Sequence, residues 1–336
     1  MEHSDERVPM EAVRAAALAL AGVVRRTELV PFRGAGGEDL FLAPELHQAV
    51  GSFKLRGVYH AVRSLPEEVR AHGLSTVSAG NTAQALAWCG RHFGVEARSL
   101  MPEGAPSAKV DAVRALGGTP VLVPTAELFR FLREHLWERE PYAFVHPWTD
   151  RTVWAGHGTL GLEIAEALPE VETVFVPVGG GGLLAGVGSA LRALLPSVRI
   201  VAVEPAGCPS FFEARRHGRP VEVACDTICD GVAVPYVTDE LFGLLSGLAD
   251  EIVLVEEREV RRAIRDLALS NKLVAEGAGA LATAAARAIP VEERGRSVAL
   301  LTGGSIDPAK LASILMEPAR TASVTFLQPP RLEESD

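Results

Sequence analysis

Short apolar runs alternate with longer amphipathic stretches along most of this chain. Runs with few polar positions, such as TVFVPV at 173–178, are typical of strands that helices cover on both faces. We expect strands at 40–43, 74–77, 97–101, 119–123, 142–145, 173–178, 199–203, 251–255 and 297–301.

Stretches with helical periodicity separate many of these runs. The first, at 9–26, has Pro9 where a first helical turn tolerates it. We expect further helices at 54–64, 82–93, 107–116, 126–139, 151–167, 183–195, 257–269 and 277–288. Alternating strands and helices predict an α/β protein with mostly parallel sheets.

The same pattern predicts two domains, each with three αβα layers. Residues 74–145 have the pattern of a compact βαβαβ unit. We place a small domain at 73–147 and build a large domain from 1–72 and 148–336.

Composition limits the kinds of partner. The 336 residues carry a net charge of −10, which argues against nucleic acid. The charged start, MEHSDERVPM, has no signal-peptide core, and the apolar run at 15–24 is far shorter than the roughly 20 residues of a membrane span. We expect a soluble, cytoplasmic protein.

The four cysteines, Cys89, Cys208, Cys225 and Cys229, lack the spacing of a zinc site. We expect them to be free thiols in a reducing compartment.

Four consecutive glycines, Gly179, Gly180, Gly181 and Gly182, join an expected strand to the helix that opens at Leu183. Glycines let backbone amides approach a ligand, and a helix start favours an anion. The turn predicts a phosphate site. Gly180, Gly182 and Ala185, with Glu204 after the next strand, also match the loose dinucleotide fingerprint, so a nicotinamide or flavin site stays open here.

A second candidate is Lys54 in the turn GSFKLRG at 51–57. A lysine beside Phe53 and between glycines can be partly desolvated, which lowers its pKa and makes it a nucleophile toward aldehydes. The chain has only four lysines, Lys54, Lys109, Lys272 and Lys310. Only Lys54 lies in such a turn.

Two further turns carry polar side chains at strand ends. Ser78, Ala79, Gly80, Asn81 and Thr82 lead from a strand into a helix, an arrangement that suits a carboxylate. Thr302 follows the last strand, where α/β sheets bind ligands.

These four pieces, in this order, resemble the fold-type-II pyridoxal-phosphate (PLP) enzymes, and within them the threonine/serine dehydratase and serine racemase family. The resemblance covers about residues 26–318. Supporting stretches are HP at 146–147, AGHGT at 155–159, VEP at 203–205, DGVAV at 230–234 and EGAGA at 276–280.

The resemblance implies PLP, a monophosphate, in the cleft between two domains, and a homodimer. It implies that Lys54 holds PLP as a Schiff base, that Gly179 to Leu183 bind its phosphate, that Asn81 bonds the ring hydroxyl and that Thr302 faces the pyridine nitrogen. The Ser78–Thr82 turn would hold the substrate carboxylate, and Phe53 would pack near the ring or in the core. An alcohol at the pyridine nitrogen makes the ring a weaker electron sink, which suits elimination of a β-hydroxyl.

Some positions depart from the family pattern. Ala79 replaces the second serine of racemases, so racemisation is disfavoured. Thr82 replaces the usual histidine, which leaves β-replacement or a threonine synthase-like reaction as an alternative. A third hypothesis is a non-catalytic metabolite-binding protein. Trp148 indicates a different pocket wall, and His157, in place of glutamine, fits a structural role better than a pocket role.

Two acidic residues concern metal binding and the cofactor. Glu204 is the one carboxylate at a position where some relatives bind a cation, and Ser210 replaces an aspartate there. One carboxylate supplies too few oxygen ligands for a divalent cation, so we expect no metal. Glu276 lies near the cofactor or serves only as a helix-terminal acid.

Overall fold

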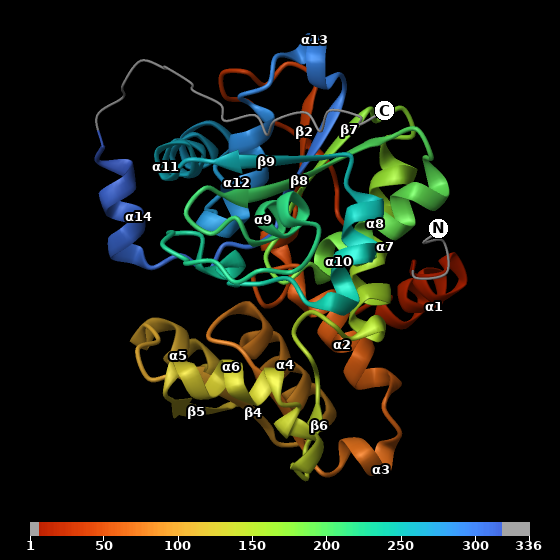
Figure 1. Cartoon of the computed structure of the whole chain (residues 1–336), viewed down its shortest axis with the longest axis vertical. Coiled ribbons are helices and arrows are strands. Elements are labelled where there is room, and N and C mark those ends of the chain that lie inside the picture. The colour runs from red at the N-terminus through yellow and green to blue at the C-terminus, as the bar shows by residue number, and fades with distance from the viewer. Residues whose placement is uncertain (1–6, 318–336) are drawn as a thin grey trace.

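Two separate sheets organise the chain in the computed structural model, which describes residues 7–317 (Figure 1). The larger sheet is parallel except for its first edge strand, which is antiparallel to its neighbour. Its strand order is β1 (Val30–Pro31), β2 (Leu40–Pro44), β10 (Ser297–Leu301), β7 (Thr173–Pro177), β8 (Arg199–Pro205) and β9 (Glu251–Val255).

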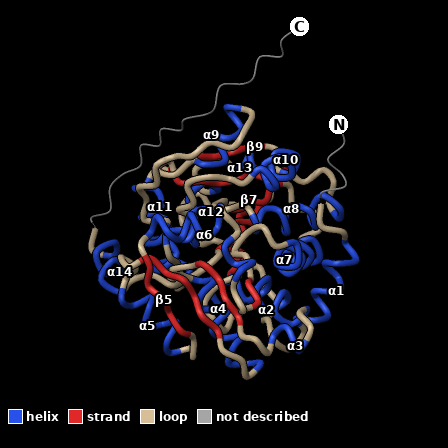
Figure 2. Tube along the Cα trace, turned by 60° about the horizontal axis from the view of Figure 1, so that its bottom comes forward, coloured by secondary structure: helices blue, strands red, loops and turns tan. Residues whose placement is uncertain are grey.

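The smaller sheet is entirely parallel, and its strands run alongside one another in Figure 2. Its order is β5 (Thr119–Val123), β4 (Ala97–Pro102), β3 (Leu74–Val77) and β6 (Ala143–Phe144). The predicted α/β class with mostly parallel sheets is confirmed. We propose that the two sheets mark the domains at 73–147 and at 1–72 with 148–336.

Helices cover both faces of the larger sheet. One apolar cluster joins α7 and α8 to the sheet, and a second joins α11 and α12 to its opposite face. The helices of this part of the chain are α1 (Met10–Leu20), α2 (Lys54–Ser64), α7 (Arg151–Ala167), α8 (Gly182–Leu194), α9 (Ser210–His217), α10 (Asp239–Leu248), α11 (Glu257–Asp266), α12 (Gly277–Ala286), α13 (Val291–Arg294) and α14 (Pro308–Leu315).

Four helices accompany the smaller sheet in sequence: α3 (Glu67–Arg70), α4 (Asn81–Phe93), α5 (Ser107–Ala115) and α6 (Thr125–Arg133). Short 3₁₀ turns occur at Glu45–His47, Leu136–Arg139 and Asp230–Val232, and a π-helical turn at Leu267–Asn271 extends α11.

Two expected helices are shorter than their patterns suggest. The helix expected at 9–26 ends at Leu20, and Gly22 follows with φ +78°. The helix expected at 126–139 is divided at His135, whose φ is +51°. A left-handed residue ends the α-helical hydrogen-bond pattern, which apolar spacing alone does not reveal.

The expectation of four free thiols is wrong for two of them. Cys208 and Cys225, 17 residues apart, form a disulfide that ties the turn after β8 to the segment 219–236. Cys89 and Cys229 are free and buried, and burial raises the pKa of the Cys229 thiol to about 12.

Within residues 7–317, no helix is both long enough and apolar enough to cross a membrane.

Candidate active site

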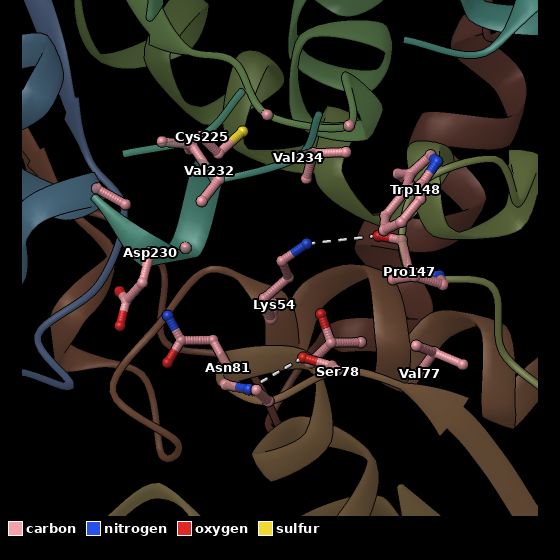
Figure 3. A pocket seen from close by; sticks show the side chains of 18 of the residues that line it. Lys54, Val77, Ser78, Asn81, Pro147, Trp148, Cys225, Asp230, Val232 and Val234 are labelled. Atoms are coloured by element: carbon pink, nitrogen blue, oxygen red, sulfur yellow. Dashed lines mark hydrogen bonds between the residues drawn. The ribbon is translucent and has the colours of Figure 1, made fainter. Parts of the chain in front are cut away.

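A cavity of about 620 Å³ lies where the two sheets face each other, and it draws its walls from both parts of the chain (Figure 3). Its lining includes Lys54, the Ser78–Thr82 turn, the glycine turn 179–182 and Thr302. The four pieces that the sequence singled out therefore meet in one place.

The glycine turn connects β7 to α8 at the edge of this cavity. Gly181 has φ +92°, a left-handed conformation that other residues adopt only at a cost. A Cβ at Gly180 would lie 2.5 Å from Cγ of Trp148, so packing against the indole also requires glycine here. No side chain caps the start of α8 within residues 7–317. The first amides of α8 are thus available to an anion.

Backbone bonds attach the Lys54 turn to the end of β10. Phe53 N donates to Thr302 O at 3.0 Å, and Gly304 N donates to Gly51 O at 3.0 Å. Lys54 then begins α2, and its side chain projects into the cavity between Asn81 and Val232 (Figure 3).

The Lys54 amine is poorly solvated. Its Nζ donates to Pro147 O at 3.4 Å and lies 5.0 Å from the centre of the Phe53 ring. Burial lowers the pKa of Lys54 to about 8, although the nearby Glu276 carboxylate opposes this shift. The amine is therefore closer to neutral at physiological pH than an ordinary lysine, as a nucleophile requires.

The partly buried Asn81 and the buried Glu276 form a pair beside Lys54. Asn81 Nδ2 donates to Glu276 Oε1 at 2.6 Å. Burial raises the pKa of Glu276 to about 7, and the charge of Asp230 adds to this effect. Asn81 Oδ1 is buried without a hydrogen-bond partner among the described residues. Such an atom indicates a polar group still to be bound, and Glu276 lies at the cavity instead of serving only as a helix-terminal acid.

The other predicted residues also line the cavity. Ser78 Oγ accepts a hydrogen bond from Gly80 N at 3.1 Å. Thr302 Oγ1 donates to Ala278 O at 3.3 Å. Phe53 is 9% exposed and lies 4.7 Å from the His157 ring, centre to centre.

His157 is 1% exposed and does not line the cavity. Burial lowers the pKa of its imidazole well below the ordinary value. It lies behind Phe53, outside the cavity, but neither ring nitrogen has a hydrogen-bond partner among the described residues, so its structural role stays a prediction.

The sequence did not single out the ion pair between Lys109 of α5 and Asp230 of the segment 219–236, both of which line the cavity. It also missed how Trp148 is fixed. His146 Nδ1 accepts from Trp148 N at 3.3 Å and from Thr149 N at 3.0 Å, and Trp154 Nε1 donates to Trp148 O at 2.5 Å. The ion pair joins residues 121 positions apart that only the tertiary fold brings together, whereas the Trp148 contacts span at most six residues.

The carboxylate of Glu204 is occupied by protein donors. It accepts 2.8 Å hydrogen bonds from Phe211 N and Phe212 N. No group of three His, Cys, Asp or Glu side chains within residues 7–317 is arranged to hold a metal ion. The absence of a bound metal stays a prediction.

Comparisons with known proteins agree with this geometry. The model of a family described as pyridoxal-phosphate dependent enzyme matches residues 20–303. An L-threonine ammonia-lyase of Thermotoga maritima is 40% identical over 309 residues, which are 89% of this chain and 76% of the relative.

Solved structures give the same picture. The processed form of threonine deaminase isoform 2 from Solanum lycopersicum superimposes with a TM-score of 0.84 at 32% identity, over 94% of this chain and 93% of that one. Maize serine racemase gives a TM-score of 0.83 at 28% identity, over 91% of this chain and 96% of that one.

Proposed function

We propose that this chain, which belongs to the family of pyridoxal-phosphate dependent enzymes, is an ammonia-lyase acting on a 3-hydroxy amino acid. L-Threonine or L-serine would be converted to a 2-oxo acid and ammonia. The observation that carries the proposal is that the desolvated Lys54 amine and an uncapped glycine turn line one cavity. The similarity to L-threonine ammonia-lyase over most of the chain supports the reaction type.

The residues of the cavity fit the functional groups of PLP. The amides of Gly179 to Leu183 would bind its phosphate, and Lys54 would bond its aldehyde carbon. Asn81, whose Nδ2 is held by Glu276 and whose Oδ1 has no partner among the described residues, would place that oxygen beside the ring hydroxyl. Thr302 would face the ring nitrogen, and Phe53 would border the ring. In this arrangement PLP lies in the cleft between the two domains.

When bound, PLP supplies an aldehyde that condenses with amines and a ring that draws electrons from the substrate α-carbon. With substrate bound, the free Lys54 amine would be the base that removes the α-proton. Its pKa of about 8 leaves part of the amine unprotonated near neutral pH. The C–O bond at the β-carbon would break as the α-proton passes to Lys54, and the departing hydroxide would take up this proton and leave as water. The enamine left behind would tautomerise and react with water, which yields the 2-oxo acid and ammonia.

The turn at 78–82 would hold the substrate carboxylate. It leads into α4, whose start is capped by no side chain in the described part of the chain, so amides and the Ser78 and Thr82 hydroxyls can face an anion. Fixing the carboxylate orients the α-proton toward one face of the substrate. Ala79 offers no acid or base on the opposite face, which favours elimination over racemisation.

A β-replacement or threonine synthase-like reaction is the second candidate, and Thr82 is the observation that favours it. Thr82 is 3% exposed and lines the cavity. Such an enzyme would join a nucleophile to the β-carbon. Assays with and without an added thiol, or with phosphohomoserine, separate it from an ammonia-lyase. A non-catalytic metabolite-binding protein would release no ammonia in any assay.

The direct test is release of ammonia and 2-oxo acid from L-threonine and L-serine by the PLP-loaded protein. We expect both products in equal amounts, and we expect Lys54→Ala to lose at least about 10³-fold in kcat. Lys272→Ala is the matched control, because Lys272 is exposed and does not line this cavity. A protein that has the yellow colour of PLP bound as a Schiff base, but releases neither product from any 3-hydroxy amino acid, would contradict the proposal.

We also propose that the protein is a homodimer in the cytoplasm. The family resemblance supports the dimer. The Cys208–Cys225 disulfide is a feature that a reducing compartment would open unless it is protected. Sedimentation of the purified protein and thiol trapping in intact cells test these two points.

A further inference from the structure

One end of the cavity is lined by hydrocarbon from helix α6. Leu128 and Leu132 of this helix are 6% and 5% exposed, and they pack in one apolar cluster with Val77. Phe129, from the same helix, also lines the cavity. The Trp148 indole, held by the contacts described above, packs against this cluster. Because these residues lie on a helix and a fixed ring, the wall is preformed.

The segment 219–236 faces this wall from the other side of the cavity. Val234 and Pro235 of this segment line the cavity. The Tyr236 ring meets the Phe129 ring edge to face, with centres 6.3 Å apart. Aromatic contacts of this kind and the paired backbone of the segment, where Val223 N donates to Pro235 O at 2.8 Å, keep the two walls together.

The charged side chains that line the cavity either lie away from the α6 wall or are paired with each other. Its ionisable lining residues are Lys54, Lys109, Asp230 and Glu276. Lys54 and Glu276 lie at the reactive end, and Lys109 is engaged by Asp230. A carboxylate or ammonium placed against the α6 wall would lose its hydration without gaining an ion-pair partner there, which is costly.

We infer that the substrate is a 3-hydroxy amino acid whose β-carbon carries an apolar group larger than methyl, a branched alkyl or phenyl group, which packs between Leu128, Phe129 and Leu132 of α6 and Val234. This inference rests on the proposed function. A methyl group would leave most of this wall in contact with water. Each additional methylene buried in a hydrophobic pocket improves discrimination by about tenfold or more.

The test is a series in which only the β-substituent changes: serine, threonine, 3-hydroxynorvaline, 3-hydroxyleucine and 3-phenylserine. Ammonia release gives kcat/KM for each. We expect kcat/KM to rise along the series, with the best large substrate at least about tenfold above threonine. A maximum at serine or threonine, with a fall for larger groups, would overturn the inference while leaving the proposed function intact. No ammonia from any member would instead refute the proposed function.

Substitutions in the wall test which residues set the preference. Leu132→Phe fills the space and should lower the ratio of kcat/KM for 3-phenylserine to that for serine by at least about tenfold. Leu122→Phe is the matched control, because Leu122 is 45% exposed on β5 and outside the cavity; this ratio should not change. If Leu132→Phe does not fold, Phe129→Ala provides the second test. Phe129 is partly exposed, so the protein should tolerate this truncation, and we expect the same ratio to fall. An unchanged ratio in the folded wall variants would overturn the assignment.

Discussion

At the scale of single residues, the reactivity of the site depends on the solvation of one amine. Burial by the cavity walls lowers the pKa of Lys54, and the negative charge of Glu276 offsets only part of this lowering. His157 and Phe53 pack behind it without donating a charge. The chemistry assigned to Lys54 therefore follows from its position at the start of α2 and not from its residue type alone.

The lowered pKa of Lys54 predicts how PLP capture depends on pH. With a pKa of about 8, about one tenth of the amine is neutral at pH 7 and about nine tenths at pH 9. The rate at which PLP-free protein captures PLP should rise about tenfold over this range and then level off. Stopped-flow absorbance measures this rate. A rise of about a hundredfold with no plateau, as an ordinary lysine would give, would contradict the assignment.

At the scale of elements, the ends of β7 and β10 and the starts of α8, α2 and α4 bring the site together. Parallel strands place their carboxyl ends at one edge of the sheet, where ligands bind. The turn at Gly179–Gly182 follows β7, and Thr302 follows β10, which is the neighbour of β7 in the sheet. Backbone bonds then attach the Lys54 turn to Thr302.

The backbone of the glycine turn yields a prediction about PLP affinity. Gly181→Ala forces a side chain into a left-handed position with φ +92°, at a cost of about 1–2 kcal/mol. Relaxing this strain moves the α8 amides, so we expect the Kd for PLP to rise at least about tenfold. Fluorescence titration with PLP measures the change.

Gly218→Ala is the matched control for Gly181→Ala. Gly218 also has positive φ, at +66°, but a Cβ there would meet no atom within 4 Å, and the residue ends α9 away from the cavity. The Gly218→Ala variant should lose a similar amount of stability and keep the Kd for PLP unchanged. Equal PLP affinities in the two variants would show that the turn does not bind the phosphate.

The buried Arg56 holds α2 in place two residues after Lys54. Its guanidinium donates to Glu45 Oε2 at 2.7 Å and to Glu163 Oε2 at 2.7 Å, and both Arg56 and Glu45 are at most 1% exposed. Arg56→Met leaves the Glu45 carboxylate buried without its cation, which should cost about 3–5 kcal/mol in the free energy of unfolding.

Urea unfolding of the PLP-free protein measures this cost. The double variant Arg56→Met with Glu45→Leu removes both charges and should recover part of the loss. If the double variant were less stable than Arg56→Met alone, desolvation of Glu45 could not be the cause of the loss.

Strands were easier to predict from the sequence than several helices. β3, β5, β9 and β10 have the expected ends, because each is a short run rich in aliphatic and β-branched residues, although β5 is an edge strand with no buried residue. Helix α10, DELFGLLSGL, was missed; its two glycines lower helix propensity, and burial against α8 compensates in a way that local sequence does not show.

At the scale of the whole molecule, the segment 219–236 connects the two parts of the chain. Arg133 of α6 forms a salt bridge with Glu222 at 3.0 Å, and Lys109 of α5 pairs with Asp230. The Cys208–Cys225 disulfide ties the same segment to the larger sheet. The sequence predicted the candidate site residues from local turns, but neither the disulfide nor these ion pairs has a local signal, because their partners meet only through the tertiary fold.

Opening the disulfide should destabilise the protein. Closing a loop of 17 residues contributes about 3 kcal/mol in the chain-entropy description. We expect Cys225→Ser to lower the Tm by several degrees, and dithiothreitol to lower the Tm of the wild type but not of this variant. The decreases in Tm caused by the substitution and by the reductant should not add. An additive decrease would mean that the bond between these cysteines does not form.

The identity of the PLP-binding residue can be measured directly by borohydride reduction of the yellow holoenzyme followed by peptide mass mapping. We expect one phosphopyridoxyl group per chain, on the peptide that contains Lys54. The same group on Lys109, Lys272 or Lys310, or labelling that survives unchanged in Lys54→Ala, would contradict the site described here.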